Sequence, residues 1–119
     1  ACRAIRDQKE ERSNSAAKKA MLYIQENYSK DISLDDVSGL VNISPYYFSK
    51  IFKEETGENF IEYLTKIRIE KAKELLVKPD ISIKEAGIRS GYTDPNYFSR
   101  IFKKQTDMTP SEYKTRYGE

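Results

Sequence analysis

Two similar segments of the chain carry basic, amide and hydroxyl side chains at helical spacing. At about 100° per residue, these side chains gather on one side of residues 45–56 and on one side of residues 95–106. Arg and Lys can bind the O6 and N7 atoms of guanine, Asn can bind adenine, and Ser suits either, so this chemistry would read base edges in a major groove. The residues are Tyr46, Ser49, Lys50 and Lys53 in the first segment and Asn96, Ser99, Arg100 and Lys103 in the second.

The opposite side of each segment is apolar, which predicts two amphipathic helices. The apolar residues are Tyr47, Phe48, Ile51 and Phe52 in the first and Tyr97, Phe98, Ile101 and Phe102 in the second. We expect this side to lie in the core. A solvated polar face is the alternative interpretation of the other side. The same positions recur in both segments, which a solvated surface would not require, so recurrence favours a binding face.

The two segments are copies of one unit. Residues 45–63 align with residues 95–113 at an offset of 50, with ten identities in nineteen positions. Upstream the match continues at an offset of 49, with Ser33 over Ser82, so the second copy has one extra residue in its turn. Such self-similarity indicates a tandem duplication of a helical unit.

Capping signals divide the chain into helices. An N-cap residue, followed by proline or by an acid three residues on, stands before most of the expected helices. Glycine fits the left-handed residue after two of them. The start signals are Ser33, Ser44, Asn59, Ser82, Asp94 and Thr109, and the end signals are Gly57 and Gly91. The predicted helices are 15–28, 33–41, 45–56, 59–77, 83–90, 95–106 and 110–116, with no strand.

The expected fold class is therefore all-α, with seven helices in two tandem, homeodomain-like helix-turn-helix subdomains joined by a long connecting helix. We expect the first subdomain at 15–57, the connecting helix within 58–78 and the second subdomain at 79–119. The connecting helix would span about 28 Å and is expected to bury Phe60, Leu64, Ile67 and Leu75. Successive major grooves recur about every 34 Å, so two recognition helices held by such a spacer could read adjacent turns. Residues 1–14 are charged and aperiodic, and we expect a linker from a missing upstream domain.

Composition excludes most enzyme classes. The 119 residues include no histidine and one cysteine, Cys2, which rules out His-based triads and thiolate cages. We therefore expect no enzyme, no metal or other cofactor and no small-molecule ligand. The longest uncharged stretch, 37–49, is too short to span a bilayer, so no membrane partner is expected. The net charge of +2 is by itself a weak argument for nucleic acid.

The chain resembles the two-helix-turn-helix DNA-binding domain of the AraC/XylS transcription regulators over about residues 15–117. The resemblance lies in SLDDVSGLVNISPYYFSKIFKEETGENFIEYLTKIRIEKAKELL and in SIKEAGIRSGYTDPNYFSRIFKKQTDMTPSEYKTR. Within that family it is most similar to the output domain of YesN-type two-component response regulators. The resemblance implies a cytoplasmic bacterial regulator of transcription. It also implies that Tyr46, Ser49 and Lys50 read bases in the first recognition helix, as Asn96, Ser99 and Arg100 do in the second.

The implied partner is double-stranded promoter or operator DNA of about two helical turns, and RNA polymerase is a further candidate. Lys53 and Lys103 are placed for phosphate, as are the helix starts at Ser33 and Ser82. Idle surface lysines and ordinary capping are the alternatives for these four residues. The alternative functions are a helical protein–protein interaction module, or the same DNA-binding domain attached to a small-ligand sensor instead of a phosphoacceptor receiver.

The second copy departs from the family pattern at three positions. Where the family usually has larger side chains, this chain has Ala86, Gly87 and Ser90. Glycine inside a helix costs up to about 1 kcal/mol against alanine, and Asp107 replaces the helix-ending glycine of the first copy. We expect the second subdomain to be less stable than the first.

Overall fold

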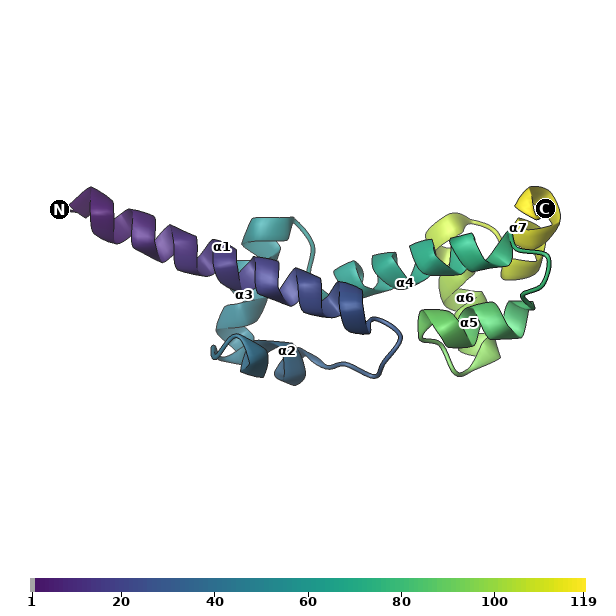
Figure 1. Ribbon diagram of the computed structural model, residues 1–119, viewed down its shortest axis with the longest axis horizontal. Coiled ribbons are helices and arrows are strands. Elements are labelled where there is room, and N and C mark those ends of the chain that lie inside the picture. The colour runs from purple at the N-terminus through teal and green to yellow at the C-terminus, as the bar shows by residue number, and fades with distance from the viewer. Residues whose placement is uncertain (1) are drawn as a thin grey trace. The chain divides into compact units, whose positions relative to one another are not determined.

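The computed structural model describes the backbone of residues 2–119 and the side chains from Ser15 onward. Over this part of the chain the fold is all-α, as predicted, with seven helices and no strand (Figure 1). The helices are α1 (Cys2–Asn27), α2 (Leu34–Leu40), α3 (Pro45–Thr56), α4 (Phe60–Leu76), α5 (Ile83–Ser90), α6 (Pro95–Thr106) and α7 (Pro110–Tyr117).

Most helix boundaries agree with the sequence prediction. Helices α3, α5 and α6 begin and end at the predicted residues, and α2 and α4 are one residue shorter at each end. The largest difference is in α1, which begins at Cys2 and not at residue 15. Residues 2–14 are rich in Arg, Lys, Glu and Gln, which favour helix even without an apolar stripe. The lone thiol of Cys2 lies outside the described side chains.

The two copies start and end their helices with the same chemistry. At the start of α2 the hydroxyl of Ser33 accepts from the amide of Asp36 at 3.1 Å, and the carboxylate of Asp36 accepts from the amide of Ser33 at 2.9 Å. At the start of α5 the hydroxyl of Ser82 accepts from the amide of Glu85 at 3.1 Å. Helices α3 and α6 both end in a left-handed residue, although its type differs: Gly57 after α3 (φ 83°) and Asp107 after α6 (φ 64°). The caps therefore place these helix starts and ends at equivalent positions in the two copies.

The first of two compact units contains residues 1–27 and 32–64. Its core is built from apolar side chains of α1, α2, α3 and the start of α4. The ring of Tyr63 packs edge-on against Phe52, with centroids 5.4 Å apart. The buried residues are Ala17, Ala20, Ile24, Ile32, Val37, Phe48, Ile51, Phe52, Phe60 and Leu64. The predicted core side of α3 is thus confirmed except at Tyr47, which is 41% exposed.

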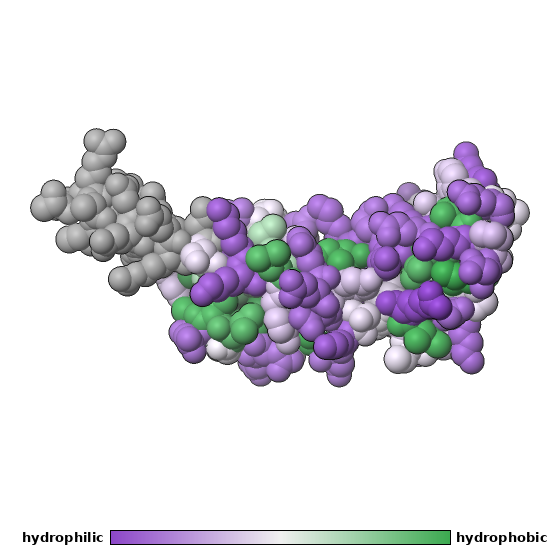
Figure 2. Space-filling model, viewed as in Figure 1, coloured by the Kyte–Doolittle hydropathy of each residue, from purple (hydrophilic) through white to green (hydrophobic). Residues whose placement is uncertain are grey.

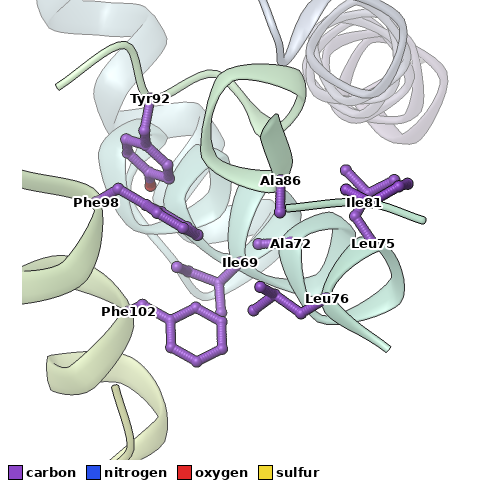
Figure 3. Packing of buried hydrophobic residues seen from close by; sticks show 9 residues of the cluster. All are labelled: Ile69, Ala72, Leu75, Leu76, Ile81, Ala86, Tyr92, Phe98 and Phe102. Carbon is purple, nitrogen blue, oxygen red and sulfur yellow. The ribbon is translucent and has the colours of Figure 1, made fainter. Parts of the chain in front are cut away.

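The second unit contains residues 28–31 and 65–119. Figure 3 shows Ile69, Ala72 and Leu76 of α4 pointing toward the rings of Phe98 and Phe102 of α6. Tyr113 packs edge-on against Phe102 at 5.5 Å, which repeats the contact between Tyr63 and Phe52. The cluster consists of Ile69, Ala72, Leu75, Leu76, Ile81, Ala86, Tyr92, Phe98 and Phe102.

Besides Tyr47, three further expected core positions are less buried than predicted. Tyr97 is 48% exposed, and Ile67 and Ile101 are half-buried. In the second half of α4 the buried positions include Ile69 and Leu76 instead. One apolar stripe was expected along the whole connecting helix, whereas α4 packs into the first unit with its first turns and into the second unit with its last.

The small residues of α5 have a different role from the one expected. Ala86 is fully buried within the core cluster, and Gly87 is buried against the ring of Phe98. The small side chains therefore let α6 approach α5 closely, and the premise that they remove apolar contact is wrong. The lower stability of the second subdomain stays a prediction.

Candidate nucleic-acid interface

The polar side of α3 is exposed and forms one continuous face. Tyr46 is 84% exposed, Lys50 and Lys53 are exposed, and Ser49 is half-buried. The structure thus brings together all four residues predicted on this helix. They line a shallow surface depression together with two residues that were not predicted at this face. The lining residues are Tyr46, Ser49, Lys50, Lys53, Glu54 and Asn59.

Buried aromatic rings and a cap fix the orientation of this face. Phe48 and Phe52, on the other side of α3, are fully buried and pack against each other at 5.4 Å. The hydroxyl of Ser44 accepts from the amide of Tyr47 at 3.2 Å and begins the helix. Before it, Asn42 adopts a left-handed conformation (φ 60°) in the turn from α2. Because its underside is held in the core, α3 can present only the polar side outward.

The equivalent side of α6 forms a second face in the second unit. Asn96, Arg100 and Lys103 are exposed and Ser99 is half-buried. Arg100 and Lys103 form no hydrogen bond or ion pair within the described part of the chain. Their donors are therefore available to a ligand. The carboxylate of Asp94 accepts a hydrogen bond from the backbone N–H of Asn96 at 2.9 Å and caps the start of α6.

Arg68 of α4 connects the segment after α1 with the turn that leads into α6. Its Nε donates to the carbonyl of Tyr28 at 2.7 Å and its Nη2 to that of Lys30 at 2.9 Å. The guanidinium also lies 5.3 Å from the centre of the Tyr92 ring, a distance typical of a cation–π contact. Burial raises the pKa of Tyr92, and the nearby charge of Arg68 partly opposes that rise. Tyr92 in turn stacks on Phe98 at 5.7 Å, so the base of the second face is firmly packed.

Lys114 fixes α7 to the end of α4 in the same unit. Its ammonium donates to the carbonyls of Leu76, Lys78 and Ile81 at 3.1, 2.9 and 2.9 Å. These carbonyls lie at and beyond the last turn of α4, where no further helical amide is available. A single cation therefore satisfies three acceptors and closes the second unit.

The two predicted phosphate contacts at helix starts are occupied by capping bonds. The hydroxyls of Ser33 and Ser82 each accept from an amide three residues on. The amide of Ser33 is also taken by Asp36, whose carboxylate would repel a phosphate. Capping explains both serines, and their contact with phosphate stays a prediction.

Three further residues belong to these faces and were missed. Glu54 and Asn59 line the depression beside Lys50 and Lys53. Lys104 follows Arg100 by four residues and is exposed. The sequence carried a signal for two of them, since Glu54 and Lys104 each follow a predicted base-reading residue by four positions. Residues four apart in a helix lie on the same side.

The visible surface is mostly hydrophilic, with smaller hydrophobic areas between the charged side chains (Figure 2). Among the described residues, no three side chains of His, Cys, Asp or Glu are grouped as a metal site would require. No helix in this part of the chain has the length and apolar character needed to cross a bilayer.

A family model described as "Helix-turn-helix domain" matches residues 37–116. Regulatory protein PocR of Salmonella typhimurium is 37% identical over 106 residues, which cover 89% of this chain and 35% of PocR. The chain spans about a third of the length of PocR, and 33% and 15% of two other curated relatives.

Solved structures of similar sequence have the same fold. The C-terminal domain of AraT, a response regulator from Geobacillus stearothermophilus, is 40% identical with a TM-score of 0.84, and 87% of each chain is covered. The C-terminal domain of the two-component response regulator YesN from Fusobacterium nucleatum is 34% identical with a TM-score of 0.80. That match covers 84% of this chain and 98% of the YesN domain.

Proposed function

The chain belongs to the helix-turn-helix family of AraC-type DNA-binding domains of transcription regulators, and we propose that it binds a specific sequence of double-stranded DNA. The resemblance expected from the sequence, including that to YesN, is confirmed. One observation carries the proposal: α3 and α6 each bury aromatic rings on one side and expose basic and polar donors on the other. The solvated-surface interpretation does not account for the same arrangement in both copies.

We assign base reading to the first two turns of each recognition helix. In α6, Arg100 would bind O6 and N7 of a guanine and Asn96 would bind an adenine, each with two hydrogen bonds. In α3, Lys50 would bind a guanine and Tyr46 would contact a thymine methyl group or a phosphate. Ser49 and Ser99 would each form one hydrogen bond with a base edge, as donor or as acceptor.

Lys53 and Lys103 lie one turn beyond the base-reading positions, and we assign both to phosphate oxygens. Contacts of this kind fix the register of the protein on the duplex without reading sequence. Ser33 and Ser82 stay secondary candidates, because their capping bonds leave only the free amides of the following helix turn for a phosphate.

The two copies would act as subdomains on neighbouring turns of one duplex. We propose the first subdomain at 15–57, the second at 79–119 and the connecting helix within 58–78. Each would place its recognition helix in a major groove, and the two grooves would be successive. The site would then cover about two helical turns.

We propose that the chain is the output domain of a cytoplasmic response regulator. The names of AraT and YesN describe those two proteins as response regulators. RNA polymerase is the second partner that a promoter-bound regulator would contact, and no catalytic activity is expected. The alternative to a response regulator is the same DNA-binding domain attached to a small-ligand sensor. The alternative to DNA binding is a helical protein–protein interaction module.

Selection of bound sequences from random duplexes, followed by footprinting, tests the proposal. We expect one enriched sequence, protection of about 16–20 base pairs and a log affinity that falls linearly with log salt. The double variant Asn96→Ala and Arg100→Ala should lose the preference at the bases read by α6 while remaining folded. A wild-type chain that enriches no sequence and binds duplex without salt dependence would favour the protein-interaction alternative.

A further inference from the structure

The two recognition helices differ strongly in charge although they are copies of one sequence. In α3 two lysines are balanced by Glu54 and Glu55, so that the helix is neutral. In α6 an arginine and two lysines have no acidic neighbour within the helix, which gives a charge of +3. Two replacements make this difference, since Glu54 and Glu55 correspond to Lys104 and Gln105 at the offset of 50.

The first helix of each motif extends the same difference. Helix α2 carries Asp35 and Asp36 and no basic residue, which gives −2. Helix α5 carries Lys84 and Arg89 against Glu85, which gives +1. Arg89 pairs with Glu85 at 2.7 Å, so the charge of Lys84 stays unbalanced. The acidic motif and the basic motif therefore lie in different units of the chain.

The unequal charges stand on the faces that carry the base-reading residues. Glu54 lines the depression together with Lys50 and Lys53. Lys104 is exposed one turn past Arg100. Neither Glu54 nor Lys104 forms a hydrogen bond or an ion pair within the described part of the chain. Both charges would thus meet the same ligand as their neighbours.

DNA phosphates respond to the net charge that a face presents. Sequence-independent affinity rises with the number of phosphates that cations neutralise, and charges within about 8–10 Å act on one another at ordinary salt. On α3 the carboxylate of Glu54 opposes the attraction of Lys50 and Lys53. Within α6 no acidic side chain stands beside Lys103 and Lys104, and the nearest carboxylate, that of Asp107, follows the end of the helix.

We propose, on the basis of the DNA-binding function proposed above, that the second helix-turn-helix unit holds DNA of any sequence and the first engages only a matching site. Lys103 and Lys104 provide the attraction to the backbone. Glu54 keeps the first face from binding phosphate without the base contacts of Tyr46 and Lys50. Both copies would read bases at a matching site, but only the second would hold DNA that lacks one.

The equivalent lysines Lys53 and Lys103 give a matched test. Fluorescence anisotropy would follow binding of the full chain to a labelled random-sequence duplex of about two helical turns, over a series of KCl concentrations. Lys103→Ala should reduce the slope of log affinity against log salt by about 0.9, the value for one phosphate contact. Lys53→Ala should reduce it by less than half as much. Equal reductions would overturn the proposal.

A charge swap tests the role of Glu54 and Lys104 directly. The double variant Glu54→Lys and Lys104→Glu keeps the net charge of the chain, so a general charge effect predicts no change. In this background we expect Lys53→Ala to reduce the slope of log affinity against log salt more than Lys103→Ala does, which reverses the order in the wild-type chain. An unchanged order would overturn the proposal.

Urea unfolding of each variant separates binding from stability, because Lys103 and Lys104 also lie in the last turn of α6, where cations stabilise a helix end. Lys19→Glu on α1 is the control for a charge reversal outside both motifs.

If the swap variant fails to fold, Lys104→Gln decides: a slope reduced by about 0.9 supports the proposal, and an unchanged slope overturns it. A wild-type chain that binds no duplex at low salt would overturn the proposed function as well. If the chain does bind and Lys53→Ala and Lys103→Ala reduce the salt slope equally, only this inference is overturned.

Discussion

Gly87 lies against the ring of Phe98 so closely that a Cβ atom at Gly87 would fall 2.8 Å from Cδ2 and 3.1 Å from Cγ of that ring. Phe98 is 2% exposed and packs against Tyr92 and Phe102 at 5.7 and 5.8 Å. The ring therefore has little room to withdraw. Glycine at this position sets how closely α5 approaches the recognition helix α6.

Gly87→Ala should therefore destabilise the protein although alanine is the better helix former. The steric cost of overpacking, about 1–3 kcal/mol, outweighs a gain of up to about 1 kcal/mol in helix propensity. Gly39 of α2 is the matched control, because a Cβ there meets nothing within 4 Å. Gly39→Ala should stabilise by about 0.5–1 kcal/mol. Urea unfolding measures both, and a stabilising Gly87→Ala would contradict the packing argument.

Asp107→Gly should stabilise the second unit. Asp107 ends α6 with φ 64°, a conformation that costs a residue with a Cβ about 1–2 kcal/mol and costs glycine little. Since glycine also loses more chain entropy on folding, we expect a net gain of about 0.5–1 kcal/mol. The converse change in the first copy, Gly57→Asp, should destabilise, because Gly57 has φ 83°. Thermal unfolding of the two variants checks this, and shifts of the same sign would be the contrary result.

Lys114→Met should destabilise by about 2–3 kcal/mol. The methionine keeps much of the apolar stem but leaves three carbonyl groups without the ammonium that they share. Lys78→Met is the control, since the side chain of Lys78 is exposed and makes no hydrogen bond within the described residues. Chemical denaturation compares the two. Equal, small effects would mean that water replaces the ammonium at no cost.

Stability should fall in alkaline solution because of Tyr92. Burial raises the pKa of this phenol above its usual 10.0, with Arg68 opposing part of the rise. In the unfolded chain the phenol loses its proton near pH 10, whereas the folded chain retains it to higher pH. Above about pH 10 the unfolded state thus binds fewer protons, and the free energy of unfolding decreases by up to about 1.4 kcal/mol per pH unit. The decrease stops above the folded pKa.

Tyr92→Phe isolates this effect, because the other tyrosines titrate in both proteins. The stability advantage of the wild-type chain over the variant should be constant below about pH 9 and should shrink as the pH rises above about 10. Urea unfolding at several pH values gives the difference. An advantage that does not depend on pH would show that Tyr92 titrates alike in the folded and unfolded chains.

Local signals in the sequence were enough to predict the recognition helices and their faces. Pro45 and Pro95 begin these helices, and aromatic residues four apart, such as Phe48 and Phe52, mark the buried side. Packing between helices could not be predicted in the same way. Gly87 was taken as a defect because the ring that fills its place is eleven residues away in the sequence, at Phe98.

The anchors of the second unit were missed for a similar reason. Arg68 reaches the carbonyls of Tyr28 and Lys30, and Lys114 reaches those that follow α4. A single long basic side chain that binds backbone carbonyls leaves no pattern in the sequence. The length of α1 was missed because the sequence was searched for an apolar stripe, and residues 2–14 have none.

The separate tasks of Arg100 and Lys103 give the sharpest prediction on DNA. Arg100→Ala should weaken the selected site by about 1–3 kcal/mol and relax the preference at one base pair, with little effect on random duplex. Lys103→Ala should weaken both DNAs alike and reduce the salt slope by about one. Arg100→Lys is the control that keeps the charge and loses the planar fork, so it should keep the salt slope and still lose discrimination. If Arg100→Ala also changes specific and random binding in the same proportion, as Lys103→Ala is expected to do, then Arg100 does not read a base, and the assignment of α6 as a recognition helix would have to rest on other side chains.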